Sequence, residues 1–190
     1  MITFILLNGP AQSGKTTLAL AIQSLLETKY ADRVMRFELK APLISALNGL
    51  VENHFPNYEN HTYEELKKAS FGQNITGRDI MIEMGNTLRL RDPWFLPRIL
   101  GENVEQADKA DPIVIVDDLG FEPEFQYFLH HPDSRHMVIY TESRHHRLYS
   151  HGQQFENDSR VCLRGHADFI DPEPDVVVES ISAIVGQLGE

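Results

Sequence analysis

The stretch GPAQSGKT, residues 9–16, is the most informative part of this 190-residue chain. It fits the pattern G-x-x-x-x-G-K-[ST], in which two glycines let the backbone curl so that successive N–H groups point into one hollow. Lys15 can then reach the β- and γ-phosphates of a nucleotide, and the Thr16 hydroxyl can bind Mg²⁺. A helix that begins near Gly14 adds the positive end of its dipole. The stretch therefore predicts a binding site for a nucleoside triphosphate.

The residues on either side of this loop follow the order strand, loop, helix that the motif requires. Residues 2–7 form a continuous apolar run, which is typical of a buried parallel strand. After the loop, Leu18, Ile22 and Leu26 recur at helical spacing, which predicts a helix from residue 14 to about 30. We assign nucleotide binding to the loop and the first helical turn: Gly9, Ala11, Gln12, Ser13, Gly14, Lys15, Thr16 and Thr17.

Strand patterns alternate with helix patterns along the rest of the chain. This alternation predicts an α/β fold of three layers, with a central parallel sheet of about five strands and helices on both faces. Ligands bind at the carboxyl edge of such a sheet. Further strands are expected at residues 33–39, 113–116, 137–141 and 176–178, and further helices from residue 41, from residue 63, and around 80–88, 94–100, 122–129 and 181–188.

Two aspartates follow the run IVIV at residues 113–116, which reads as a central buried strand. A carboxylate at the end of this strand can hold Mg²⁺, directly or through water, opposite Thr16. Spacing alone does not decide between Asp117 and Asp118. The alternative is a strand-end aspartate that caps the following helix.

Eight of the eleven arginines fall in two stretches of the chain. Arg78 precedes Arg89 and Arg91 by eleven and thirteen residues in the helix expected around residues 80–88. These arginines can therefore bind one anionic ligand only if the helix borders a cleft or bends. A solvated helix face is the alternative. Arg144 and Arg147 lie in a polar segment at about 142–171 that shows no periodicity and that we interpret as a lid over a triphosphate.

Composition limits the classes of partner. The formal net charge of −11 argues against a general binder of nucleic acids or membrane surfaces. The single cysteine, Cys162, excludes an internal disulfide, and the histidines of the 142–171 segment match no zinc pattern. The sequence shows no signal peptide or membrane-spanning stretch, so we expect a cytoplasmic protein.

Four further segments, at pattern level, resemble the deoxynucleoside monophosphate kinases of bacteriophages, within the P-loop nucleoside and nucleotide kinases. FELKAPL at residues 37–43 is similar to the segment that follows the second strand in that family. Residues 76–91 are similar to the family's T-[PG]-R…Q-x-[LI]-G helix, and residues 118–124 to its D-V-R-F-x-N-E. Residues 175–188 are similar to its closing strand and helix. The chain departs from the family at three positions, which carry Ile82, Gly120 and Pro123.

The resemblance implies a kinase that moves the γ-phosphate of ATP to a (deoxy)nucleoside monophosphate with Mg²⁺ as cofactor. It implies a single P-loop kinase domain over residues 1–190, with an acceptor-binding helical region at about 41–105. It favours Asp118 over Asp117 as the carboxylate at the metal. The catalytic residues would be Lys15, Arg78, Arg144 and Arg147; the substrate-binding residues Arg78, Glu83, Arg89, Arg91 and Asp118; and the metal ligands Thr16, Asp118 and Asp117.

Two other functions fit the same loop. A kinase for a hydroxyl acceptor, such as a modified base or a polynucleotide end, would need a general base, for which Asp117 is the candidate. A nucleotide-sensing module would bind ATP without turnover. For the kinase, we expect small nucleotides as partners, neither membrane nor nucleic acid, and we leave a homodimer open. Its location would be the host cytoplasm if a phage encodes it.

Overall fold

The computed structural model describes residues 1–10, 13–54, 62–72, 74–142, 163–166 and 186. Contacts divide the chain into two compact units. Unit 1 comprises Met1–Leu39 and Pro97–Glu190, and unit 2 comprises Lys40–Leu96. Each unit has its own elements and its own packing, so each is described by itself.

A parallel sheet forms the centre of unit 1. Among the described residues it has five strands in the order β2-β3-β1-β4-β5, which confirms the predicted α/β fold. The central strand β1 lies between β3 and β4, with Leu6 level with Val116 on one side and with Val138 on the other. The strands are β1 (Ile2–Asn8), β2 (Val34–Phe37), β3 (Ile113–Val116), β4 (Ser134–Glu142) and β5 (Leu163–His166).

Helix α1 (Lys15–Tyr30) packs on one face of this sheet. Side chains alternate between the two faces of a strand, and Ile5 and Leu7 of β1 point toward α1. Their neighbours on β3 and β4 are in register with them, so the same face continues across three strands. The resulting core is almost fully buried and consists of Ile5, Leu7, Leu18, Ala19, Ile22, Leu26, Val34, Ile113, Ile115, Met137 and Ile139.

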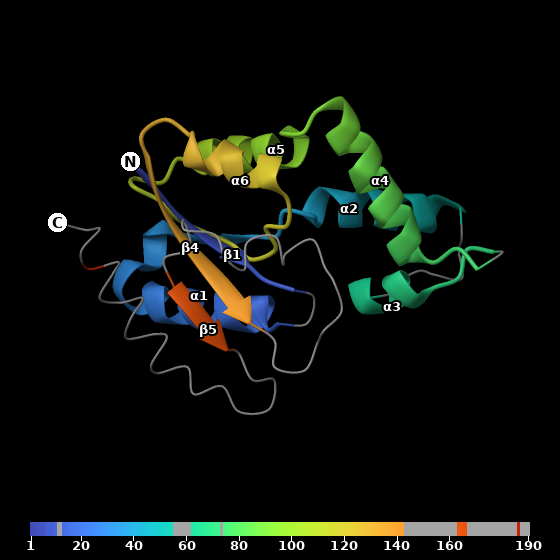
Figure 1. Ribbon diagram of the computed structural model, residues 1–190, viewed down its shortest axis with the longest axis horizontal. Helices are drawn as coiled ribbons and strands as arrows, with labels where there is room; N and C mark the ends of the chain where they lie inside the picture. Colours follow the sequence, from blue (N-terminus) through green and yellow to red (C-terminus); the bar gives the residue numbers. More distant parts are fainter. Residues whose placement is uncertain (11–12, 55–61, 73, 143–162, 167–185, 187–190) are drawn as a thin grey trace. The chain divides into compact units, whose positions relative to one another are not determined.

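The opposite face carries helices α5 (Phe95–Gln106) and α6 (Glu122–Leu129). Figure 1 shows α1 on one side of β1 and β4 and these two helices on the other. The Phe4 ring of β1 lies 5.1 Å from the Phe128 ring of α6, measured between centroids. Gly101 gives the Tyr127 ring room, since a Cβ at this glycine would lie against the tyrosine hydroxyl. Helices therefore cover both faces, as the alternating patterns predict.

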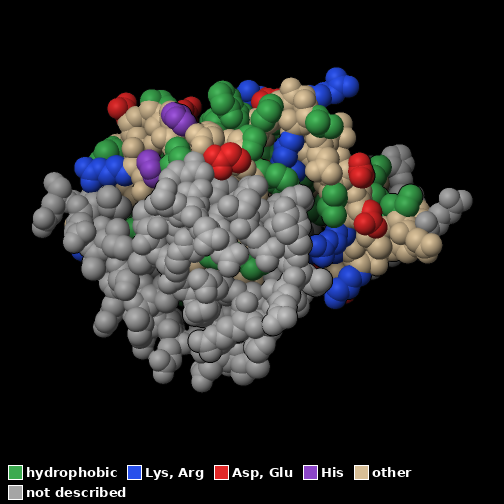
Figure 2. Space-filling model, in the orientation of Figure 1, with side chains coloured by type: hydrophobic (Ala, Val, Ile, Leu, Met, Phe, Trp, Pro, Cys, Tyr) green, Lys and Arg blue, Asp and Glu red, His purple; other side chains and the backbone are tan. Residues whose placement is uncertain are grey.

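Among its described residues, unit 2 contains helices α2 (Ala41–His54), α3 (Tyr63–Lys68) and α4 (Gly77–Arg91). The start of α4 packs closely on α3, because a Cβ at Gly77 would overlap the Leu66 carbonyl and lie 3.3 Å from Leu47 of α2. Leu43, Leu47 and Leu66 are buried. Figure 2 shows acidic and basic side chains interspersed over this part of the surface, without a broad patch of either sign.

The expected elements agree with the structure in kind and differ in extent. The strand expected at 137–141 is longer, and the helix expected at 94–100 continues to Gln106. A short 3-10 helix, η1 (Ala31–Arg33), occupies the start of the strand expected at 33–39. Strand β5 lies within the 142–171 segment, where the sequence shows no periodicity and no strand was expected. The strand expected at 176–178 and the helix after it lie outside the described residues.

Candidate functional site

The loop after β1 takes a backbone shape that depends on its two glycines. Gly9 has a φ angle of 147° and Gly14 a φ angle of 82°, values that residues other than glycine rarely adopt. A Cβ at Gly9 would also clash with the carbonyl and hydroxyl oxygens of Thr141. The backbone conformation therefore requires glycine at both positions, and the close packing requires it at Gly9 as well, as the motif predicts.

The Lys15 ammonium lies against the same loop. It donates hydrogen bonds to the carbonyl oxygens of Gly9, at 2.8 Å, and Pro10, at 2.6 Å. Helix α1 begins at Lys15, has no side-chain cap at Gly14 and has no acidic residue in its first turn. An uncapped helix start next to an ammonium group attracts anions. Thr16, the proposed magnesium ligand, is exposed in the same turn.

Three buried polar groups join the loop to the end of β4. The hydroxyl oxygens of Ser13 and Thr141 are 2.5 Å apart, and the Thr141 hydroxyl also donates to the Asn8 carbonyl at 3.1 Å. Asn8 in turn donates from its side-chain amide to the Leu119 carbonyl at 2.7 Å. The loop is thus bonded to β4, and the end of β1 that precedes it is bonded to the segment that follows β3.

Asp117, which follows β3, is fully buried and paired with a cation. The Arg36 guanidinium of β2 lies 2.5 Å from its Oδ2 atom, and the Glu38 carboxylate lies 3.6 Å from the same guanidinium. Arg36 is level with Ile115 in the register between β2 and β3, so it reaches the carboxyl end of β3 from the neighbouring strand. Asp117 is therefore part of a buried ion pair.

Asp118 is half-buried and is bonded to the backbone. Its Oδ1 atom accepts a hydrogen bond of 2.5 Å from the N–H of Leu39, the last residue of unit 1 before unit 2 begins. The loop that follows is held by Glu124, whose carboxylate accepts hydrogen bonds from the N–H groups of Gly120 and Phe121. Hydrogen bonds therefore hold the segment at residues 118–124 at both of its ends, through Asp118 and through Glu124.

The donor set at this edge suits magnesium rather than a closed metal cage. Mg²⁺ prefers oxygen ligands and is commonly held by one or two carboxylates together with substrate phosphates. Thr16 and Asp118 offer such oxygens, and Asp117 offers a carboxylate whose Oδ2 atom is paired with Arg36. Within the described part of the chain, no group of three His, Cys, Asp or Glu side chains is placed to hold a metal ion.

The candidate acceptor residues of unit 2 lie on α4. The helix begins with a capping box in which the Asp79 carboxylate accepts from the Thr76 hydroxyl at 2.6 Å and from its N–H at 2.8 Å. These bonds lower the pKa of Asp79, with the hydroxyl bond as the largest cause. Since the helix continues to Arg91, eleven residues place Arg78 and Arg89 on one face but about 16 Å apart along the axis. The helix does not gather them at one point.

Arg89 is positioned by a glycine. A Cβ at Gly85 would lie 2.9 Å from the Arg89 guanidinium and 3.2 Å from Leu43, so the missing side chain leaves room for both. Arg89 is half-buried, whereas Arg78 and Arg91 are exposed. Of the three arginines, Arg89 is therefore the most buried, and its guanidinium packs beside Gly85 of the same helix.

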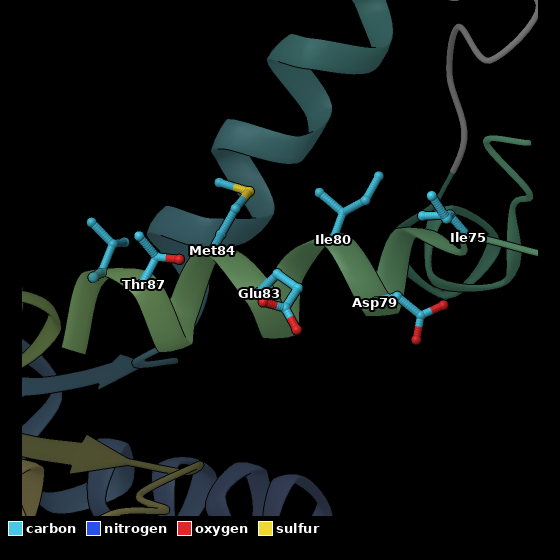
Figure 3. Close-up of a pocket in the computed structure, with 7 residues that line it drawn as sticks. Ile75, Asp79, Ile80, Glu83, Met84 and Thr87 are labelled. Atoms are coloured by element: carbon cyan, nitrogen blue, oxygen red, sulfur yellow. The ribbon is translucent and has the colours of Figure 1, made fainter. Parts of the chain in front are cut away.

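A groove of about 620 Å³ lies along α4. Figure 3 shows Ile80 and Met84 projecting to one side of the helix, with the Glu83 carboxylate at its front. Glu83, the predicted substrate residue, is exposed, and a carboxylate beside apolar side chains can accept hydrogen bonds from a flat, partly apolar ligand. The groove is lined by Ile75, Asp79, Ile80, Glu83, Met84, Thr87 and Leu88.

Four predicted site residues lie outside the described residues: Ala11, Gln12, Arg144 and Arg147. Two residues that now belong to the site were missed by the sequence analysis. A signal for Arg36 exists, since it is a charge within a mostly apolar strand that neighbours an aspartate-terminated one. A signal for Thr141 is weaker, because a polar residue at a strand end is common.

No family model and no curated protein matches the sequence. Solved structures match it at low identity. The structure of APE1195 is 14% identical, with a TM-score of 0.48 over 100% of this chain and 97% of its own. Thymidylate kinase from Ehrlichia chaffeensis is 16% identical, with a TM-score of 0.47 over 98% of this chain and 99% of its own.

The hexameric APS kinase from Thiobacillus denitrificans is 14% identical, with a TM-score of 0.45 over 98% of this chain and 29% of its own. These identities and TM-scores are too low to transfer an activity, a substrate or an assembly to this chain.

No helix in the described ranges is both long and apolar enough to cross a membrane.

Proposed function

We propose that this chain is a P-loop kinase that transfers the γ-phosphate of ATP to a (deoxy)nucleoside monophosphate. The observation that carries the proposal is the loop at the carboxyl end of β1, where two glycines with positive φ, an uncapped helix start and the Lys15 ammonium meet. This combination suits a triphosphate because backbone N–H groups and a cation face the same anion.

The candidate site residues of unit 1 have separate tasks in this proposal. Lys15 and the loop N–H groups hold the donor phosphates, and Thr16 and Asp118 would hold Mg²⁺. The metal supplies charge neutralisation between the β- and γ-phosphates when bound. Because an acceptor phosphate is already ionised, no residue has to remove a proton from it. Positioning and charge are sufficient.

The acceptor is proposed to bind unit 2, with its base in the groove along α4 and its phosphate at Arg91. Arg91 follows Thr87 by four residues and so lies on the same face of α4 as the groove, whereas Arg78 and Arg89 lie on the opposite face. A carboxylate only accepts hydrogen bonds, so Glu83 favours a base that presents N–H groups. Guanine offers two adjacent ones, N1–H and the 2-amino group, and matches a carboxylate with two parallel bonds. Glu83→Gln should therefore reduce any preference for guanine over the other bases.

The test is a coupled assay of ADP formation with ATP, Mg²⁺ and each of the common deoxynucleoside monophosphates in turn. Turnover with at least one of them, lost in Lys15→Ala, is the expected result. A folded protein that binds ATP but turns over none of them would contradict the kinase and favour the nucleotide-sensing alternative.

A kinase for a hydroxyl acceptor is less well supported. It would need a general base, and the candidate from the sequence, Asp117, is fully buried and bonded to Arg36. A carboxylate in that state is poorly placed to take a proton from an acceptor hydroxyl. Salt-sensitive binding of DNA ends would favour this alternative nevertheless.

A further inference from the structure

We propose that Thr141 is a positioning residue for the phosphate loop, and that it acts on triphosphate binding through Ser13. The inference rests on the proposed function, since it concerns the same loop. It assigns a task to a residue on β4 that lies more than 120 positions from Ser13 in the sequence and has no place in the G-x-x-x-x-G-K-[ST] pattern.

The first observation is the close approach of the loop to β4. Asn8 of β1 is level with Tyr140 of β4, so the residues that follow them, Gly9 after the end of β1 and Thr141 on β4, are neighbours. A Cβ at Gly9 would clash with two oxygens of Thr141 and lie 2.8 Å from the Ser13 hydroxyl. The loop thus starts in direct contact with Thr141, and its position depends on what occupies that site.

The second observation is the count of protons in the buried network. The Thr141 hydroxyl has one proton, which it donates to the Asn8 carbonyl. At the 2.5 Å contact with Ser13, Thr141 must then accept, and Ser13 must donate. The Ser13 proton is therefore committed to the protein. It follows that Ser13 serves a phosphate through its backbone and not through its hydroxyl proton.

Burial makes this network sensitive to the loss of one oxygen. Ser13 is 1% exposed, and Asn8 and Thr141 are 0% exposed. If the Thr141 oxygen is removed, the Ser13 hydroxyl loses its acceptor where water does not reach it, and the loop has to shift to satisfy it. A shifted loop presents its N–H groups to a phosphate at poorer distances and angles.

The experiment compares binding of ATP with Mg²⁺, and of inorganic tripolyphosphate, by calorimetry in four proteins. Thr141→Val removes the hydroxyl at nearly constant shape and should weaken both ligands by about tenfold to 100-fold, the range expected for a buried donor left without an acceptor. Thr141→Ser keeps the hydroxyl and should stay within about threefold of the wild type. Thr3→Val, a buried threonine near the amino end of β1, is the matched control and should bind as the wild type does.

The outcomes separate this inference from the proposed function. A wild type that binds neither ligand refutes the proposed function and the inference with it. A wild type that binds both, with Thr141→Val equally tight, overturns the inference alone. Equal losses in Thr141→Ser and Thr141→Val would also overturn it, because the hydroxyl would not be the cause.

A second variant covers the case in which Thr141→Val does not fold. Ser13→Ala removes the other hydroxyl of the same bond and leaves Thr141 bonded to Asn8. We expect a smaller affinity loss in this variant, because the bond that ties the loop to β4 is lost but no buried donor is left without an acceptor; an unchanged affinity would overturn the inference. Where turnover is measurable, the KM for ATP should rise while kcat changes little, a split that a general loss of stability would not produce.

Discussion

Replacing Arg36 by methionine tests whether the ion pair at the carboxyl end of β3 is buried in solution as it is in the structure. Arg36→Met keeps most of the length and the apolar stem of the side chain but removes its charge. Asp117 is 0% exposed and its Oδ2 atom lies 2.5 Å from the guanidinium. The variant therefore leaves a carboxylate in the protein interior without its nearby cation.

The magnitude follows from burial. Removing one partner of a buried ion pair costs about 3–5 kcal/mol, because the remaining charge is not compensated. Arg36 retains 24% of its side-chain exposure, so solvent screens the pair in part, and we take the lower end, about 3 kcal/mol. With a urea m-value of about 2 kcal/mol/M, the unfolding midpoint should fall by about 1.5 M.

The assay is urea unfolding at neutral pH, followed by circular dichroism. Arg33→Met is the matched control, since the Arg33 Nε–H donates to the Asp111 carbonyl at the surface. It should change the free energy of unfolding by about 0.5 kcal/mol or less. Adding Asp117→Asn to Arg36→Met should recover part of the lost stability, since it removes the uncompensated charge.

The reasoning would be refuted by an Arg36→Met protein whose midpoint matches that of Arg33→Met. It would also be refuted if Asp117→Asn adds its own full cost to Arg36→Met, because two residues in one ion pair cannot be energetically independent.

Three further predictions concern the loop and helix α4. Lys15→Ala should lose ATP turnover by at least about 100-fold at an unchanged unfolding midpoint, since its amine bonds loop carbonyls and not the core; a matching loss of stability would count against this. Arg91→Ala should raise the KM of the acceptor more than that of ATP, because Arg91 lies on the face of α4 that carries the groove, whereas equal rises would argue against an acceptor role. Thr76→Ala should cost about 1 kcal/mol of stability at neutral pH. The lowered pKa of Asp79 makes the contribution of this carboxylate present above the ordinary aspartate pKa and lost as the pH falls through the lowered one. Thermal melts over that acidic range should therefore show a flatter pH dependence for Thr76→Ala, and an identical slope would contradict the capping role.

The sequence predicts the local parts of this molecule well. The strand, loop and helix around Lys15 are read directly, because a glycine-rich motif, an apolar run and a helical stripe each depend on neighbouring residues. The same is true of the helix that starts at Tyr63 and of the buried strand before Asp117. Their alternation is sufficient for the fold class.

The contacts within the candidate site could not be predicted from the sequence, because they depend on which strands are neighbours in the sheet. Arg36 meets Asp117 only because β2 pairs with β3, and Thr141 meets Ser13 only because β4 lies beside β1. The sequence left Asp117 and Asp118 as alternatives, and the structure gives them different partners. Strand β5 escaped prediction because its four residues, LRGH, include one large apolar side chain and are too few to show a pattern.

The hydrogen bond from the Leu39 amide to Asp118 has a practical consequence for spectroscopy. The chemical shift of an amide proton that is hydrogen-bonded to a carboxylate depends on the charge of that carboxylate. A cation that binds Asp118 would therefore change the chemical shift of the Leu39 amide proton. Leu39 is also the residue from which the chain leaves the sheet unit for the helical one. A single NMR cross-peak at this position would therefore report on the binding of a cation at the edge of the sheet.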